Sequence, residues 1–361
     1  MQMTSNVVDI LGIDLPIIQG PFGGGISTIE LVSAVSNRGG MGSFGAHIIA
    51  PDDFDRLTTE IRSKTDKTFA LNLWVSDHDP GGREVSADEF DRISEVFAPY
   101  YQEMGVALPT MPEKYHQRFD DQVDALIEAA PPAFSFVFGV PSKAIIAKCK
   151  QQNIITIGTA TNIAEGEALD AAGVDLIVAT GFEAGGHRVS FLKRAEDSLI
   201  GTMALVPLIA DRVSVPVIAA GGIADARGVA AALHLGAGAA QLGSAFLACA
   251  ESGTNDQHRS MLLSGDIHDT VLTRSYTGRL ARGVRNRLID EMEARVAELP
   301  PFPIQAFFIA GLKAASIARD QTDFTSIYAG QASANLRHGT VASLMDALQT
   351  GLGEHGFNAA A

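Results

Sequence analysis

Short apolar runs recur along the chain, and each is followed by a stretch with the spacing of an amphipathic helix. Eight of the runs are continuous rather than alternating, which is typical of parallel strands buried on both faces. The predicted strands span residues 16–19, 42–45, 69–74, 133–138, 154–158, 175–179, 216–219 and 239–242. Helical patterns fill the gaps, most clearly at 28–38, 142–152, 162–172, 199–211 and 225–235.

This alternation of strands and helices indicates a parallel sheet in the α/β class. Eight strand–helix units favour a closed TIM-type (β/α)8 barrel, a fold that routinely exceeds 250 residues as one unit. A doubly wound open sheet is the alternative, because strand order cannot be read from a sequence.

Two segments do not fit the repeat. Residues 76–122 lie between the third and fourth strands and are predicted to form a helical insertion over one barrel face. Residues 267–361 exceed what one closing helix needs and are predicted to be a largely helical C-terminal extension packing on the barrel. The expected division is therefore a barrel over 1–266, including the insertion, and an extension over 267–361.

Composition narrows the possible partners. The chain has 361 residues, 46% of them hydrophobic, with a formal net charge of -15. An acidic surface repels phosphate backbones and anionic lipids, so nucleic-acid and membrane partners are not expected. The two isolated cysteines, Cys149 and Cys249, form no metal or disulfide pattern, and no signal peptide or membrane span is apparent. A cytoplasmic enzyme is expected, and the sequence leaves open whether it forms a homo-oligomer.

Glycine-rich turns follow the last two predicted strands, at Gly221-Gly222 and at Gly243-Ser244. In a barrel these loops are the usual phosphate site, because glycine lets backbone N–H groups approach an anion closely. One such pair would more often be a simple turn. Two pairs in these positions predict a bound phosphate.

The turn after the sixth predicted strand reads Glu183-Ala184-Gly185-Gly186-His187-Arg188. A histidine at the carboxyl end of a barrel strand can face the active site, and its ordinary pKa suits proton abstraction. An exposed loop histidine is the alternative interpretation. Glu183 is expected to orient the loop or cap a backbone N–H, and Arg188 to hold an anion or pair with a carboxylate.

Asn72 lies inside the apolar third strand, where an amide costs free energy unless it is hydrogen-bonded. It could border a flavin or be satisfied within the core, and the sequence does not decide between these roles. For Gln19 and Gln241 the sequence likewise leaves open whether the amide binds a cofactor or is satisfied within the core. No dinucleotide fingerprint, histidine pair with metal-ligand spacing or serine nucleophile elbow is present.

The chain resembles the nitronate monooxygenases, formerly called 2-nitropropane dioxygenases, and most closely their class I members. The motifs that carry the resemblance are residues 16–21, 34–42, 183–188, 219–228, 241–244, 277–283 and 329–331. They cover most of the chain, from about Ile10 to Arg337. The same motifs also occur in some enoyl-ACP reductases and quinone reductases.

The resemblance implies an FMN cofactor across the barrel mouth, with its phosphate at the two glycine turns. It implies that His187 is the active-site base that removes a carbon-bound proton from neutral nitroalkanes, and that nitronates are oxidised by O2 to a carbonyl compound and nitrite. The implied cofactor-binding residues are Pro21, Phe22, Gly23, Asn72, Thr180, Gly185, Gly186, Gly221, Gly222, Gln241, Gly243 and Ser244.

Several positions depart from the family pattern. Phe22 stands where methionine is usual, Thr180 where glutamine is usual, and Val137 where many class I members have histidine. Val189 replaces a glycine, and residues 302–308 contain no tyrosine. The substrate pocket is therefore expected to be more apolar. The alternative functions are an NAD(P)H-dependent FMN reductase of an enoyl thioester or quinone, and a flavin-binding protein without turnover.

Overall fold

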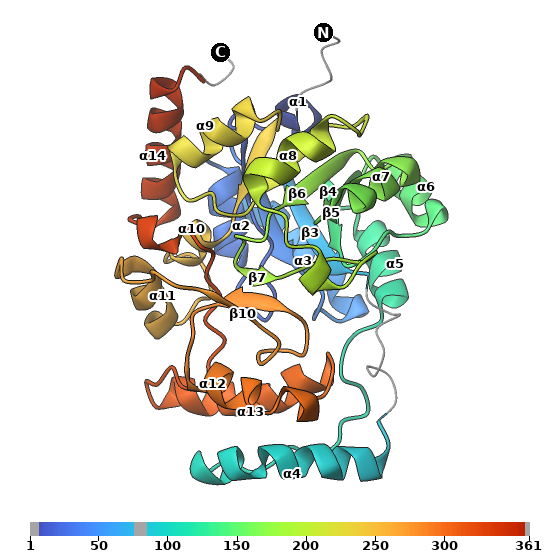
Figure 1. The fold of residues 1–361 in the computed structure, drawn as a ribbon. Helices are drawn as coiled ribbons and strands as arrows, with labels where there is room; N and C mark the ends of the chain where they lie inside the picture. Colours follow the sequence, from blue (N-terminus) through green and yellow to red (C-terminus); the bar gives the residue numbers. More distant parts are fainter. Residues whose placement is uncertain (1–6, 76–84, 358–361) are drawn as a thin grey trace.

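Eight parallel strands form a closed barrel in the computed structural model, which describes residues 7–75 and 85–357 (Figure 1). Around the barrel the strand order is β1-β9-β8-β6-β5-β4-β3-β2, and a parallel bridge between Ile18 and Met41 joins β1 to the start of β2. The barrel strands are β1 (Ile17–Gln19), β2 (Gly42–Gly45), β3 (Phe69–Trp74), β4 (Ala133–Val137), β5 (Ile155–Ala160), β6 (Leu176–Thr180), β8 (Val217–Ala220) and β9 (Ala239–Leu242).

The predicted (β/α)8 barrel is therefore confirmed, and all eight predicted strands are present. Side chains such as Ile18, Ala70, Val178 and Ile218 fill the barrel interior, and the first helix, α1 (Val7–Leu11), packs on the same cluster. In Figure 1 this helix lies at one end of the barrel, and the short strands β7 (Gly186–His187) and β10 (Val271–Thr273) lie at the other. The carboxyl ends of the barrel strands thus face a second, three-stranded sheet that contains β7 and β10.

Helices surround the barrel and bury their apolar faces against the strands. They are α2 (Ile29–Ser36), α3 (Phe54–Lys64), α5 (Phe119–Ala129), α6 (Lys143–Gln151), α7 (Ile163–Ala172), α8 (Thr202–Ala210), α9 (Ala226–His234), α10 (Ser244–Leu247), α11 (Asp256–Leu263) and α14 (Val341–Glu354). Several begin at a side-chain cap, such as Thr28, Ser142 or Asn162, which satisfies an otherwise unpaired N–H of the first turn.

The last helix, α14, packs directly on the helices of the barrel. It packs on both α2 and α9, which follow the first and the last-but-one barrel strands. Leu344, Met345 and Leu348 are buried in the same cluster as the strand and helix side chains of the barrel. Helix α14 therefore occupies the position of the eighth barrel helix, although about a hundred residues separate it from β9.

Part of the segment between β9 and α14 packs with the insertion after β3 and forms a second apolar cluster. Helix α4 (Ala87–Glu103) packs against α13 (Ile304–Ala318), with α12 (Arg287–Glu293) beside them, and Phe97 and Phe308 stack at 4.8 Å. Figure 1 shows these helices beyond the strand carboxyl ends. The predicted insertion over 76–122 contains α4 and the start of α5, and its residues 76–84 lie outside the described part.

A three-stranded antiparallel sheet lies between the barrel and this second cluster, and the sequence did not predict it. Its strands are β10 (Val271–Thr273), β11 (Ala281–Gly283) and β7 (Gly186–His187), in the order β10-β11-β7. The segment after residue 266 is thus helical only in part. Among the described residues, no helix combines the length and apolar character needed to cross a membrane.

Candidate active site

The glycine turns after β8 and β9 form a cradle of backbone donors at the carboxyl end of the barrel. Gly221 and Gly222 have φ angles of +102° and +69°, which L side chains rarely adopt. Within the described residues, no acceptor receives the N–H of Gly222, Ile223, Gly243 or Ser244. N–H groups left open in this way are suited to bind the oxygens of an anion.

The Ala329-Gly330-Gln331 segment holds this cradle together from a distant part of the chain. Gly330 N donates to Ser244 Oγ at 2.9 Å, and Gln331 N donates to the carbonyl oxygen of Glu183 at 2.9 Å. A Cβ on Gly185 would lie 2.7 Å from the Ala329 carbonyl carbon, so only glycine allows this approach. The Gly185-Gly186 turn and the Ser244 turn are therefore fixed relative to each other.

Glu183 has the capping role expected of it. Its carboxylate accepts hydrogen bonds from the Thr202 backbone N–H, at 2.9 and 3.0 Å, and from the Thr202 hydroxyl at 3.0 Å. Thr202 is the first residue of α8, so Glu183 caps that helix and anchors the turn after β6.

Arg188 is buried and binds the backbone. The residue is 1% exposed, and no carboxylate among the described residues accepts a hydrogen bond from its guanidinium. It donates instead to three carbonyl oxygens, of Thr180 and Gly181 at 3.2 and 2.7 Å and of Ser198 at 3.0 Å. Arg188 thus fixes the backbone where β6 ends. The sequence could not show this, because backbone acceptors leave no residue pattern.

His187 lies on β7 and pairs with Ala281 of β11. Its Nε2 is 2.8 Å from the Thr277 hydroxyl, although the two residues are 90 positions apart. Its Nδ1 has no hydrogen-bond partner among the described residues. A two-residue strand and one side-chain hydrogen bond thus give the ring a fixed orientation with one nitrogen available.

Burial lowers the pKa of His187 from 6.5 to about 4. The ring is therefore neutral at pH 7 and able to accept a proton. Trp74 and Tyr328 lie against it, with ring centroids 5.1 and 5.8 Å away. The exposed loop histidine considered as the alternative does not describe this environment.

Aromatic side chains line the mouth around His187. Trp74, at the end of β3, stacks on His47 at 3.9 Å and meets Phe138 and Phe302 at 5.0 and 5.4 Å. Phe138 directly follows β4 and has a φ of +65°, a strained backbone of the kind that clusters at functional sites. The mouth is therefore lined by aromatic rings on this side.

Val137, Phe138 and Val189 form a small apolar cluster against Trp74. Val137 and Val189 are two of the positions that depart from the family pattern. Both substitutions therefore place valine side chains on the same side of the mouth. The expectation of a more apolar pocket agrees with this geometry.

Sequence reasoning missed several residues of the mouth: His47, Trp74, Phe138, Thr277, Arg279, Phe302 and Tyr328. His47, Trp74 and Phe138 stand at or just after strand ends, and that position was a usable signal. Thr277 and Arg279 were noted only within the 277–283 motif. No periodicity connects them to the barrel, because their position depends on pairing between β11 and β7.

The remaining predicted residues lie at the same end of the barrel, with different partners. Asn72 Nδ2 donates to Ser135 Oγ at 2.9 Å, so part of its amide is satisfied by the neighbouring strand. Gln19 Oε1 accepts from Ser43 N at 2.9 Å, which links β1 to β2. Gln241 is the last-but-one residue of β9 and lies beside Gly20.

Pro21, Phe22 and Gly23 follow β1, and the Phe22 N–H donates to Ser27 Oγ at 3.0 Å. Gly23 lies against the His47 ring. Thr180 ends β6 and is buried, with its carbonyl oxygen bound to Arg188. The structure thus brings these residues to the carboxyl end of the barrel. Whether they bind a cofactor remains a prediction.

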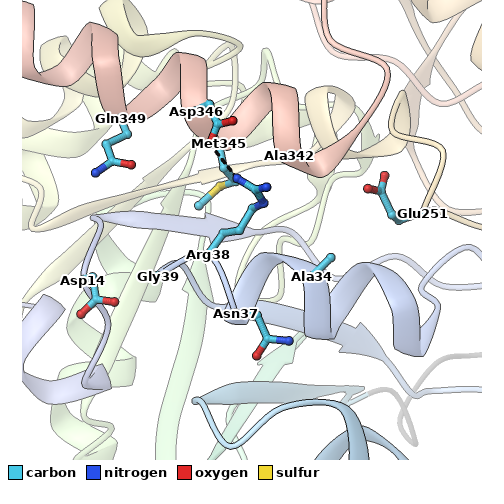
Figure 2. Close-up of a pocket in the computed structure, with 10 residues that line it drawn as sticks. All are labelled: Asp14, Ala34, Asn37, Arg38, Gly39, Glu251, Ala342, Met345, Asp346 and Gln349. Atoms are coloured by element: carbon cyan, nitrogen blue, oxygen red, sulfur yellow. Dashed lines mark hydrogen bonds and ion pairs between the residues drawn. The ribbon is translucent and has the colours of Figure 1, made fainter.

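A surface pocket of about 620 Å³ lies elsewhere, between α2 and α14. Figure 2 shows Arg38 and Asp346 facing each other across it, and their side chains form an ion pair of 2.6 Å. Both side chains are largely exposed, so the pair contributes little stability. Asp14 and Gly39 precede β1 and β2, so the pocket lies toward the amino ends of the strands, away from His187.

A pH dependence of stability follows from His258. This residue is buried, and its Nε2–H donates a hydrogen bond to the Tyr328 carbonyl oxygen at 2.8 Å. Burial lowers its pKa from 6.5 to about 4. Between these values the unfolded chain binds a proton that the folded chain does not. We expect the free energy of unfolding to fall as the pH drops from 6.5 toward 4, by about 1.4 kcal/mol per pH unit for this group.

Urea denaturation of the wild type and His258→Gln at pH 7, 6, 5 and 4.5 measures this contribution. The variant should lose less stability than the wild type over the same range. His355→Gln, at an exposed position, is the control. Equal slopes for wild type and His258→Gln would show that His258 does not contribute.

Comparison with known proteins identifies relatives of the whole chain. The family model described as nitronate monooxygenase matches residues 4–351. A probable nitronate monooxygenase of Staphylococcus saprophyticus is 35% identical over 348 residues, covering 96% of this chain and 97% of the relative. Another, of Staphylococcus aureus, is 37% identical over 328 residues and covers 91% of both chains.

Two solved structures have similar folds. A nitroalkane oxidase from Streptomyces ansochromogenes has a TM-score of 0.87 and 30% identity, covering 97% of this chain and 98% of that one. FabK from Thermotoga maritima has a TM-score of 0.72 and 27% identity, covering 98% and 97%. With a family match over nearly the whole chain and relatives above 30% identity, this chain belongs to the nitronate monooxygenase family of oxidoreductases.

Proposed function

We propose that this protein is an FMN-dependent enzyme that oxidises alkyl nitronates with O2 to a carbonyl compound and nitrite. One observation carries the proposal. A neutral, oriented His187 stands among aromatic rings at the strand carboxyl ends, beside a cradle of open backbone donors. A proton acceptor next to an anion site suits a nitro compound and a phosphorylated cofactor.

The cradle fits a terminal phosphate. Gly221 and Gly222 give it its backbone geometry, and the N–H groups of Gly222, Gly243 and Ser244 are open for oxygen acceptors. Pro21, Phe22, Gly23, Asn72, Thr180, Gly185, Gly186 and Gln241 complete the proposed FMN-binding set. Bound FMN would accept the two electrons of the substrate and pass them to O2.

His187 would accept the proton that a neutral nitroalkane loses from carbon. With a hydrogen on Nε2 donated to Thr277, the Nδ1 lone pair is free to take a proton from the carbon next to a nitro group. A base with a pKa of about 4 is a weak acceptor at neutral pH. A nitronate has already lost this proton, so preformed nitronates should react better than neutral nitroalkanes.

The apolar side of the mouth bears on the choice of substrate. Val137, Phe138 and Val189 lie against Trp74, and the side chains around them offer few hydrogen bonds to a substrate tail. Burying each methylene of such a tail contributes about 0.8 kcal/mol. We therefore expect nitronates with longer or branched alkyl chains to have lower KM values than nitromethane-derived nitronate.

Anaerobic mixing with substrate tests the proposed reaction. Propane-2-nitronate is expected to bleach the flavin absorbance of the purified protein, and NADH and NADPH are expected to leave it unchanged on the same time scale. Admitting air should restore the absorbance and release nitrite. Bleaching by NADH or NADPH alone would instead favour the reductase alternative.

The identity of the cofactor is a separate prediction. The cradle provides for one terminal phosphate, and the chain has no adenine-binding fingerprint. Heat release followed by mass spectrometry should therefore give FMN. Release of FAD, or failure to bind FMN when it is added back, would contradict the proposal.

A further inference from the structure

The loop after β2 holds a second imidazole at the mouth, and the proposed chemistry does not yet use it. His47 lies two residues beyond the end of β2, and its ring stacks on Trp74 with centroids 3.9 Å apart and planes at 6°. The ring also touches Gly23, because a Cβ on that glycine would lie only 2.1 Å from His47 Cε1. His47 is therefore in contact with both the loop after β1 and the end of β3.

The backbone of this loop is fixed from two directions. The side-chain amide of Gln122, on α5, donates to the carbonyl oxygens of His47 and Ile49 at 3.1 and 2.8 Å. The Ala46 N–H donates to the Asn72 carbonyl oxygen at 2.9 Å, which continues the pairing of β2 with β3. The two ring nitrogens of His47 take no part in this support.

The Nδ1 atom of His47 is shielded from water and has no hydrogen-bond partner among the residues that the structure describes. A shielded polar atom costs free energy when it is left unpaired. Such atoms are nearly always paired in native proteins, and an exception calls for an explanation such as a role in catalysis. The unpaired Nδ1 therefore indicates that a polar group of a ligand is bound at this point of the mouth.

His47 can offer this hydrogen bond without carrying a charge. Burial, and after it positive charge at His187 and Arg279, lowers the pKa of His47 from 6.5 to about 3. The ring is neutral at pH 7, and so weak a base is a poor proton acceptor. A neutral imidazole has one N–H and one lone pair. With its hydrogen on Nδ1, His47 is a donor directed at an acceptor such as oxygen.

His47 and His187 both belong to the aromatic side of the mouth. Trp74 contacts both rings, with its centroid 3.9 Å from that of His47 and 5.1 Å from that of His187. The two imidazoles are thus separated by no more than the length of a small molecule. The glycine cradle follows β8 and β9, and β1 lies between those strands and β2. A ligand group at His47 is therefore close to the proposed base and away from the proposed phosphate.

We propose that His47 Nδ1 donates a hydrogen bond to an oxygen of the substrate's nitro group, while His187 takes the proton from the neighbouring carbon. Identifying the acceptor as a nitro group rests on the proposed function. When the C–H bond breaks, its electron pair forms a C=N bond and negative charge moves onto the nitro oxygens. A donor already directed at one of these oxygens stabilises the charge as it develops. His47 thus acts as a binding and specificity residue for the nitro group.

A nitroalkane without a hydrogen on the carbon next to the nitro group tests binding apart from turnover. 2-Methyl-2-nitropropane keeps both nitro oxygens but cannot become a nitronate. Trp74 is the single tryptophan of the chain and stacks on His47, so its fluorescence in the FMN-bound protein follows the titration. His47→Phe keeps an aromatic ring against Trp74 and removes both nitrogens. This variant should raise the Kd by about 2- to 10-fold, the range for one lost neutral hydrogen bond.

Two amide variants locate the nitrogen that binds. His47→Asn places an amide near the position of Nδ1, and His47→Gln places one near Nε2. Both lose the aromatic stack, so they are compared with each other. The asparagine variant should bind 2-methyl-2-nitropropane more tightly than the glutamine variant. His355→Phe, at an exposed position, should leave the Kd unchanged. Binding by the glutamine variant that equals or exceeds that of the asparagine variant overturns the proposal.

Stability separates ligand binding from a structural role. Because the unpaired Nδ1 is a cost to the protein without substrate, His47→Phe in excess FMN should unfold at the same urea concentration as the wild type or a higher one. Lower stability with equal weakening of binding in all three variants would make His47 a structural residue, and the proposal would fail. If the phenylalanine variant does not fold, the comparison of asparagine with glutamine still decides.

Two further outcomes concern the identity of the ligand. Weaker retention of FMN with an unchanged Kd for 2-methyl-2-nitropropane would assign the hydrogen bond to the flavin and overturn the proposal. Weaker binding of the nitro compound in His47→Phe, in a protein that leaves nitronates unoxidised, would uphold recognition of the nitro group and reject the proposed function.

Discussion

Replacing His187 with asparagine is expected to lower the turnover of neutral nitroalkanes by about 100- to 10,000-fold, the usual contribution of a positioned general base. Asparagine keeps a polar side chain of similar reach but accepts no proton at a useful pKa. A preformed nitronate has no proton to lose, so its turnover should fall far less. Steady-state kinetics with nitroethane and ethyl nitronate, at matched flavin content, measure the difference.

The controls for this variant separate chemistry from positioning. His355→Asn, at an exposed position, should leave both substrates unaffected. Equal losses on nitroalkane and nitronate would mean that His187 orients the substrate or the flavin. Unchanged rates on both would remove His187 from the mechanism. In an NAD(P)H-dependent reductase, flavin reduction by the nicotinamide would respond little to this change.

Gly222→Asp is expected to abolish flavin retention. The new carboxylate would stand beside the proposed phosphate, and two unit charges 4 Å apart near a protein surface repel by about 4 kcal/mol. That is about a thousandfold in the Kd for FMN. Absorbance of the purified variant and titration with added FMN measure the effect.

Gly222→Asn is the matched control, because the two side chains have nearly the same shape. Both new side chains meet Glu183, whose Cβ would lie 3.2 Å from an added Cβ, and both adopt the positive φ of +69°. Asparagine and aspartate tolerate that backbone better than most residues. The asparagine variant should therefore bind FMN better than the aspartate variant. Full flavin content in Gly222→Asp would place the phosphate elsewhere.

The barrel could be predicted because its strands are local patterns. Each apolar run is continuous, ends in a turn and is followed by a helix with its own cap, as at Thr28 and Asn162. These signals need no knowledge of the rest of the chain. The turns that carry Gly222, His187 and Gly243 come directly after predicted strands, so their place at the carboxyl end of the barrel could be predicted from the sequence.

What escaped prediction depends on contacts between distant segments. The two-residue strand β7 exists because β11 pairs with it, and only that pairing brings Thr277 to His187. The hydrogen bonds of Arg188 escaped prediction because its acceptors are backbone carbonyl oxygens. The aromatic mouth combines Trp74 of β3, residues just after β2 and β4, and residues of the segment after β11. Such pairings carry no periodicity that a single sequence reveals.

The position of α14 has a consequence for how the chain folds during synthesis. Strand β9 is complete at Leu242, but the helix that covers α2 and α9 begins only at Val341. Until that segment has left the ribosome, apolar side chains of the barrel on this side lack their partner and are exposed to water. The nascent barrel should therefore need protection from aggregation through most of its translation, however early its strands pair.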